Sequence, residues 1–429
     1  MEAHYTPSER KRNYGLLVAE GILFTVGLVF FDPNTVLPLL MERMTGSAIL
    51  VGLIGAVQPL AKGIVPILSG NWISSLTHKK RFLIIAMSIG RLPLWVLGIA
   101  LIWIPETPAY FWAALIVLVQ LLFWFGDSAG DPAWMDMVGK AVPGNRRGRF
   151  FATRQVVGGL LSVAAGAAVA AILDFDGFAF PVNYGVVITI GAAIYLGNVG
   201  TFVGLVEHPS PTSERHDLVT LFRKLPSYLA ANRTFALTMG VLVLFNMARL
   251  SLPFYVVFGQ QAFGLGERAL GLFIPLQMAG RILGILTLGI IGDRYGHQRS
   301  IKTISIICVA PPLVALLTGA FANETTALAA FGLLFFLLGA YIEGWPSFMN
   351  YMLETVTERD RPMYAGLMGV GYVPSILAPL IGGVIIQTVG YSLLFAVTAA
   401  VAISGAVAAM NLPRPSRLMT RSHNDESHT

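Results

Sequence analysis

Long apolar runs separated by short polar connections are the dominant pattern of the chain. Each run is close to the ~20 residues that a helix needs to cross the hydrocarbon of a bilayer. One connection, 208–234, is much longer than the others. The pattern predicts twelve transmembrane helices, with approximate limits 14–40, 48–76, 82–104, 109–138, 149–173, 183–207, 235–259, 268–292, 300–321, 325–355, 362–388 and 390–412. We therefore expect an all-α integral membrane protein, multi-pass in the bilayer.

The positions of the basic residues predict an orientation. Most of the 29 Lys and Arg side chains lie in the two tails and the even-numbered connections, whereas the odd-numbered connections hold only Arg43 and Arg268. Cytoplasmic loops carry such an excess of positive charge. We expect both termini in the cytoplasm and the chain in a plasma (inner) membrane of the bacterial type.

The chain also repeats itself. A displacement of 219 residues aligns the second run with the eighth, so that Lys62 meets Arg281, and a displacement of 214 aligns the fourth run with the tenth, so that Pro132 meets Pro346. Parallel repeats of this kind are typical of two-bundle transporters. The predicted parts are an N-terminal tail 1–13, two pseudo-symmetric six-helix bundles 14–207 and 235–412, a linker 208–234 and a C-terminal tail 413–429. Helical spacing of apolar residues in the linker predicts an amphipathic helix, with a solvated loop as the alternative.

Composition supports a membrane protein and excludes several function classes. The chain is 55% hydrophobic and 12% charged, against about 25% charged residues in soluble domains. The net charge of +6 comes from connections between apolar runs, so we expect no nucleic-acid partner. Cys308 is the only cysteine, which excludes an intrachain disulfide and a cysteine metal site. No nucleophile with its base and no phosphate-binding loop occurs, so we predict no enzyme, metal or cofactor.

The connection after the eighth run carries a recognisable motif. It reads Gly289-Ile-Ile-Gly-Asp293-Arg294-Tyr-Gly296-His-Gln-Arg299. This order of Gly, Asp-Arg, Gly and basic residues resembles the loop motif of the major facilitator superfamily. In such a motif glycines allow close helix approach and a tight turn, and the charges latch one gate conformation.

The first-half copy of this motif departs from the family pattern. Gly70 is kept, but Ser74 stands where the acid is expected. The fifth-run Gly-Pro signature of the proton-driven drug exporters is also missing, since 157–162 contains no proline. The resemblance to the superfamily nevertheless extends over the whole chain and implies its fold of two six-helix bundles.

The resemblance implies that the first, fourth, seventh and tenth runs line a central cavity. Charged residues inside the membrane are functional candidates because they are costly there. The candidates for solute or coupling are Glu20, Asp32, Asp127, Asp131, Arg249 and Glu343. The gating or structural candidates in the other runs are Lys62, Arg91, Arg154 and Arg281. Lys62 and Arg281 occupy equivalent positions, where they either pair across the bundle interface in one state or extend to polar surroundings.

The fourth run holds two acids on one helix face, Asp127 and Asp131, while Asp136 points roughly the opposite way. A structural interpretation is that Arg91 neutralises Asp127 or Asp131 and that Arg154 pairs with Asp131 or Asp136. The functional alternative is that one of these acids carries a proton.

For two further candidates, Asp32 and Arg249, the sequence allows either a structural or a functional role. Asp32-Pro33 either marks a helix break or contacts solute. Arg249 either attracts an anionic group of the solute or pairs with Glu343 or an acid of the first run.

Taken together, these patterns predict a secondary active transporter that moves a small organic solute by alternating access, coupled to protons, with efflux as one direction. A transport-inactive sensor and a lipid flippase or scramblase on the same fold are the alternatives. The expected partners are the bilayer, the solute and protons, and the expected state is a monomer.

Overall fold

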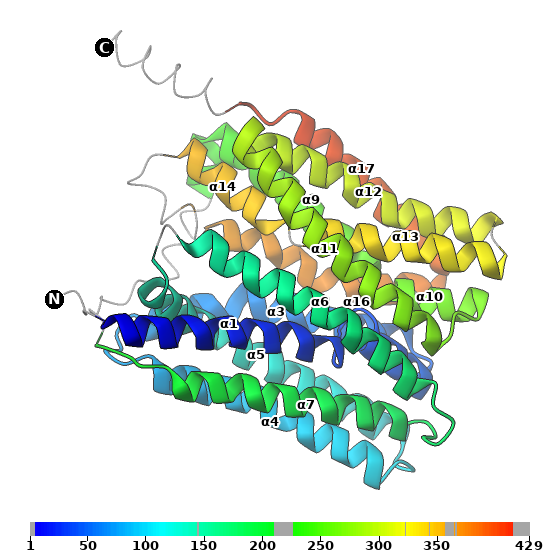
Figure 1. Ribbon diagram of the computed structural model, residues 1–429. Coiled ribbons are helices and arrows are strands. Elements are labelled where there is room, and N and C mark those ends of the chain that lie inside the picture. The colour runs from blue at the N-terminus through cyan, green and yellow to red at the C-terminus, as the bar shows by residue number, and fades with distance from the viewer. Residues whose placement is uncertain are drawn as a thin grey trace. The chain divides into compact units, whose positions relative to one another are not determined.

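The computed structural model describes residues 5–143, 146–209, 226–321, 323–342, 344–356, 364 and 367–414, and the chain in these ranges is mainly helical (Figure 1). Twelve of the helical stretches are long and apolar enough to cross a membrane, which confirms the predicted number of spans. Of the predicted linker helix, residues 226–231 are helical, and residues 210–225 lie outside the described ranges.

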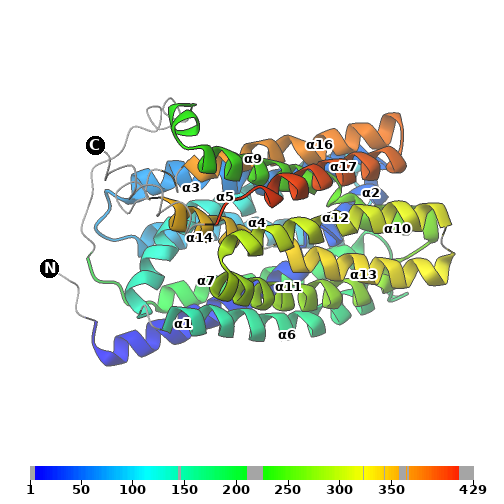
Figure 2. The ribbon, with the colours of Figure 1, turned by 90° about the horizontal axis from the view of Figure 1, so that it is seen from above.

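The first six spans are built from seven helices. They are α1 (Pro7–Val29), α2 (Val36–Thr45), α3 (Ala48–Ile73), α4 (Lys80–Trp103), α5 (Ala109–Ala141), α6 (Arg147–Leu173) and α7 (Val182–Gly204). Helix α1 packs against α6 and α7, and α4 packs against α5 and α7 (Figures 1 and 2).

The remaining spans are more often interrupted. Their elements are α9 (Arg233–Met247), η2 (Ala248–Ser251), α10 (Phe254–Phe263), α11 (Glu267–Tyr295), α12 (His297–Phe321), α13 (Glu324–Ile342), α14 (Trp345–Thr355), η3 (Gly369–Tyr372), α16 (Val373–Thr388) and α17 (Tyr391–Met410).

Within the first span, expected over 14–40, the helix breaks between α1 and α2, as the helix-break interpretation of Asp32-Pro33 predicts. Pro33 supplies no N–H there, and the Asp32 carboxylate accepts hydrogen bonds from the Asn34 N–H at 2.8 Å and from the Thr35 hydroxyl at 2.9 Å. The seventh span is also interrupted, by the 3-10 turn η2 that precedes Pro253. Helix α5, by contrast, continues through Pro132.

The chain divides into two compact units. One comprises Met1–His216 with Pro253–Met278, and the other comprises Asp217–Leu252 with Ala279–Thr429. The domain limits expected from the sequence remain predictions.

In the first unit, Gly126 of α5 lies against the backbone of Ala86 and Gly90 in α4. A side chain at Gly126 would collide with this backbone, so the glycine permits the close approach of the two helices.

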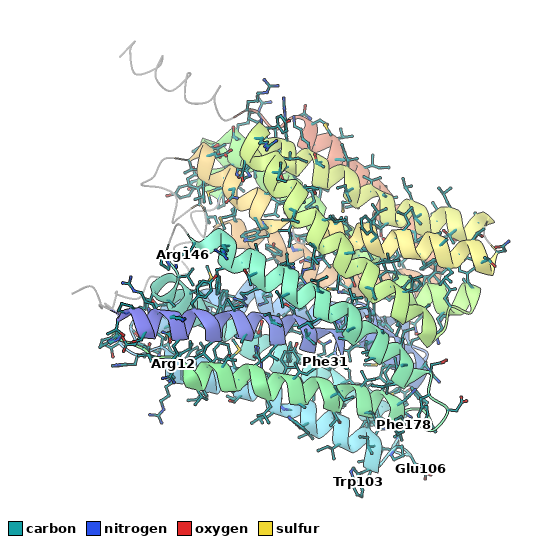
Figure 3. The ribbon with its side chains drawn as sticks, viewed as in Figure 1. Arg12, Phe31, Trp103, Glu106, Arg146 and Phe178 are labelled. Carbon is teal, nitrogen blue, oxygen red and sulfur yellow. The ribbon has the colours of Figure 1, made fainter. Side chains whose placement is uncertain are left out.

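The two ends of the first unit differ in character. Arg12 and Arg146 lie at one end of its helices, and Trp103, Glu106 and Phe178 lie at the other (Figure 3). Phe31 lies between them, near the break that follows α1. The first end is called the Arg12 end below, and the second the Trp103 end.

Candidate functional site

Two acids of α5 share one cation from α3. Asp127 and Asp131 are one helical turn apart, and the ammonium of Lys62 lies 2.8 Å from the first carboxylate and 2.9 Å from the second. Lys62 also lies 5.7 Å from the ring centre of Trp124, over the face of the indole. An ammonium held by two carboxylates and an aromatic face is well compensated for leaving water.

Asp127 has a second cation on α4. The Arg91 guanidinium lies 3.1 Å from its other oxygen, and the Arg91 side chain is only 3% exposed. Pairing of Arg91 with Asp127, one of the interpretations of the sequence, is thus confirmed as geometry. Arg91 Nε also donates to the Asn198 side chain of α7 at 2.9 Å, so that α4, α5 and α7 meet at one buried cation.

Asn198 also forms hydrogen bonds with α1, and so connects Arg91 to that helix. Its amide donates to the backbone oxygen of Glu20 at 2.9 Å and to the Glu20 carboxylate at 3.2 Å. The same carboxylate accepts from Arg154 of α6 at 2.8 Å and from the indole N–H of Trp134 at 3.0 Å. The Arg154 guanidinium lies 4.7 Å from the Trp134 ring centre.

The predicted pairing of Arg154 with Asp131 or Asp136 is therefore wrong. Arg154 is drawn to Glu20 because Gly21, the next residue of α1, leaves the space that the guanidinium occupies. A side chain at Gly21 would overlap the Arg154 guanidinium. Asp136 instead lies between Lys79, at 2.8 Å, and Lys140, at 2.5 Å.

These contacts form one connected system, which we call the charge network. Its charged members are Glu20, Lys62, Arg91, Asp127, Asp131 and Arg154, joined through Asn198 and Trp134. Six helices contribute: α1, α3, α4, α5, α6 and α7. Three carboxylates face three cations, so the network is neutral when all six groups are ionised.

Exposure within the network is uneven. The Asp131 side chain is 37% exposed and that of Lys62 34%, whereas the other four charged side chains are 14% exposed or less. Asp131 also has a single ionic partner in the network, and Asp127 has two. A proton added to Asp131 therefore breaks fewer ionic contacts than one added to Asp127.

Asp32 lies outside this system. Its carboxylate is buried at the break between α1 and α2, where it bonds Asn34 and Thr35. The interpretation of Asp32-Pro33 as a helix break is confirmed, and a local capping role accounts for these two bonds.

Three candidates lie in the second half of the chain. Arg249 is partly buried in η2, and Arg281 lies on α11. Glu343, the predicted partner of Arg249, lies outside the described residues. Roles for these three residues remain predictions.

In the loop motif after the eighth span, one glycine forms a turn and the charged residues are exposed. Gly296, between α11 and α12, has φ of 89°, a left-handed conformation that favours glycine. Asp293 and Arg294 are exposed, and so is Arg299, whose guanidinium lies over the Tyr295 ring. The expectation that Gly289 allows close helix approach is wrong, because a side chain there would meet no atom within 4 Å.

Sequence reasoning missed the residues that connect the charges. Asn198 is fully buried in a span without charged residues and joins two ionic clusters. A polar amide in the middle of a membrane helix was the available signal. The role of Gly21 could not be predicted from the sequence. Only the packed structure shows that the absence of a side chain at Gly21 makes room for the Arg154 guanidinium.

Comparison with known families gives a decisive match. The family described as Major Facilitator Superfamily matches residues 21–372, with a second match over 261–427. The chain belongs to the Major Facilitator Superfamily. Its members are membrane transporters, and the twelve spans and the repeat agree with this fold. No curated protein sequence matches the chain.

Solved structures of other superfamily members are similar in fold. A mutant of the nucleoside transporter NupG has a TM-score of 0.71 at 17% identity, covering 92% of this chain and 99% of that one. A bacterial homologue of the iron transporter ferroportin, in an inward-facing state, has a TM-score of 0.68 at 13% identity, covering 94% and 98%. At such identities the likeness establishes the fold.

Proposed function

We propose that this superfamily member is a proton-coupled secondary active transporter of a small organic solute, working by alternating access. The observation that carries the proposal is the charge network. It joins six helices of one bundle, and one of its acids, Asp131, is both partly exposed and held by a single cation. Acids in such positions mark proton pathways in transporters.

Protonation of Asp131 changes the network in a defined way. The proton neutralises Asp131, and Lys62 is then held by Asp127 alone. The network gains one net positive charge, and α3 loses one of its two ionic links to α5. A proton would thus weaken the contact between two neighbouring helices, which is the kind of bistable change that alternating access requires.

The basic residues support one orientation in the membrane. Arg12 and Arg146 lie at the same end of the first unit (Figure 3), and a positive excess marks the cytoplasmic side. We propose cytoplasmic termini in a bacterial-type plasma membrane, with the protein acting as a monomer and efflux as the direction to test first.

The test is solute flux in proteoliposomes, with a metabolite and drug panel at two external pH values. Asp131→Asn should abolish the response to an imposed pH gradient while exchange of solute without a gradient persists. Asp127→Asn should lower the melting temperature, because Arg91 and Lys62 lose a buried partner. Asp136→Asn, which alters an acid outside the network, is the matched control.

Several outcomes would overturn the proposal. Solute flux that ignores the pH gradient in the wild type removes proton coupling. Normal coupled flux in both variants with unchanged stability removes α5 from the mechanism. A folded protein that moves no solute in the panel but binds one favours a sensor, and movement of fluorescent lipid favours a flippase or scramblase.

A further inference from the structure

Besides Trp112 near its start, α5 carries three buried polar side chains with no hydrogen-bond partner among the described residues. They are Gln120, Trp124 and Ser128, each 2% exposed or less. Both amide atoms of Gln120, the indole N–H of Trp124 and the hydroxyl of Ser128 have no partner among the described residues. They are three of the most deeply buried polar groups of the helix.

Their spacing places them in one row. Residues four apart on a helix lie one above the other, so the row runs from Gln120 through Trp124 to Ser128. At 1.5 Å per residue it is about 12 Å long. The Lys62 ammonium lies 5.7 Å from the ring centre of Trp124, and Asp131 follows Ser128 by one turn. The row therefore starts beside the charge network and leads along α5 toward the Trp103 end.

This row of buried polar atoms would destabilise the folded protein if no water molecule bound to it. Burying an amide without hydrogen bonds destabilises a protein, and four polar atoms of the row have no partner among the described residues. Buried water commonly satisfies such groups, with each molecule making about three hydrogen bonds to polar atoms. Gln120 offers a donor and an acceptor, Trp124 a donor, and Ser128 both.

We propose that Gln120, Trp124 and Ser128 bind a file of buried water molecules that carries protons along α5 from Gln120, its end nearer the Trp103 end, to the carboxylate of Asp131. The inference rests on the proposed proton coupling for its role, and on the unpartnered polar atoms for the site itself. A proton enters on the water beside Gln120, each water passes one proton on, and the last transfer is to an Asp131 oxygen. The water molecules are unchanged at the end.

Ile116 closes the proposed water file at its Gln120 end, away from Asp131. It is fully buried one turn before Gln120 on the same row, and its side chain offers no hydrogen bond. The file thus ends at Gln120 in this conformation, and movement of Ile116 would be needed to open it.

The site is tested by hydroxyl-radical footprinting of the full-length protein in lipid nanodiscs. Radiolysis of a bound water oxidises the side chain beside it even when bulk solvent is excluded. Trp124 should be oxidised several-fold faster than Phe202, another buried aromatic, after correction for intrinsic reactivity. In Gln120→Met, which keeps the shape and removes both polar atoms, the Trp124 rate should fall to about a third, because water loses two partners.

A pair of serines gives a matched control. Ser128 and Ser162 are both fully buried, but the Ser162 hydroxyl donates to the Gly158 backbone oxygen at 2.8 Å. Ser128→Ala should slow flux driven by a pH gradient by about tenfold and leave exchange without a gradient within about twofold, since only the proton route is interrupted. Ser162→Ala should change neither.

The outcomes separate the site from the function. Trp124 oxidised no faster than Phe202, or a melting temperature that rises in Gln120→Met because a dry amide was removed, overturns the water file. Rapid oxidation of Trp124 with equal coupled flux in Ser128→Ala and Ser162→Ala overturns its proton role. Rapid oxidation in a wild type whose flux ignores pH leaves the water site in place and removes the proposed function.

Discussion

The two halves of the chain match in position and differ in chemistry. The cation of the second span is present in both halves, as Lys62 and as Arg281. The acids of the fourth span are not, because Tyr341 stands at the position of Asp127 and Trp345 at that of Asp131.

The first and seventh spans show the same contrast. Gly21 matches Gly240 at a displacement of 219, but Glu20 matches Met239.

The surroundings of the substituted positions differ accordingly. Tyr341 is 2% exposed and lies edge-on to Phe245, with ring centres 5.8 Å apart. Trp345 lies 5.1 Å from Tyr372 between ring centres. Aromatic packing in the second unit thus occupies positions that carry ion pairs in the first. The repeat has kept glycines and prolines, which determine helix geometry, while the chemistry of the two halves has diverged.

The largest expected effect on stability comes from replacing Asp127, the acid that pairs with two cations. Asp127→Leu removes the carboxylate that pairs with Arg91 and leaves Lys62 with Asp131 alone, and breaking a buried pair in this way costs about 3–5 kcal/mol of unfolding free energy. Tyr341→Phe, at the equivalent position, should cost no more than about 1 kcal/mol. Thermal unfolding in detergent measures both, and similar melting temperatures would show that the network adds no stability to the first half.

The next effect concerns two equivalent glycines. Gly21→Ala forces Arg154 away from its position and should cost about 1–3 kcal/mol. A side chain at Gly240 meets no atom within 4 Å, so Gly240→Ala in α9 should stabilise by about 0.5–1 kcal/mol. The two variants should move the melting temperature in opposite directions. Equal shifts would contradict the role assigned to Gly21.

A smaller effect is expected from exchanging the cation of one half for that of the other. Lys62→Arg keeps a positive charge between Asp127 and Asp131 but adds volume, at a cost of about 1 kcal/mol. Lys62→Met removes the charge and should cost several times more, as two carboxylates then face each other. Unfolding curves of the two variants distinguish charge from packing, and equal losses would assign Lys62 a packing role.

The smallest expected effect is a pH dependence at Glu42. Gln261 is the repeat counterpart of Glu42 and donates to it at 2.5 Å within the first unit. Burial raises the pKa of Glu42, and the Gln261 hydrogen bond opposes this in part. An acid whose pKa is raised by folding binds its proton more tightly in the folded state, so stability falls as pH rises through the range above its ordinary pKa.

Glu42→Gln should therefore flatten the pH profile of the melting temperature, by about 1 °C because the group is partly exposed. Melting temperatures of both proteins between about pH 4 and pH 7 cover the ordinary pKa and the range above it. An unchanged slope would remove Glu42 as its cause.

The fold could be predicted from the sequence because its determinants are local. Span length and loop charge are readable residue by residue, and they predicted twelve spans that the structure contains. The site was only partly predictable. Counting residues from the membrane surface placed Arg91 at nearly the same depth as Asp127, so their pairing could be predicted. The partner of Arg154 depends on how the helices are rotated about their axes, and that rotation is fixed by contacts such as the one at Gly21. A single sequence does not show which face of a helix meets which neighbour.

The neutrality of the charge network has a consequence for membrane voltage. Three positive and three negative side chains that move together do no net electrical work in the transmembrane field. One added proton gives the group a unit charge, and carrying it across the whole field is worth about 2.3 kcal/mol per 100 mV. The proton-loaded form would thus be driven by the membrane potential, and the unloaded form would return without electrical resistance.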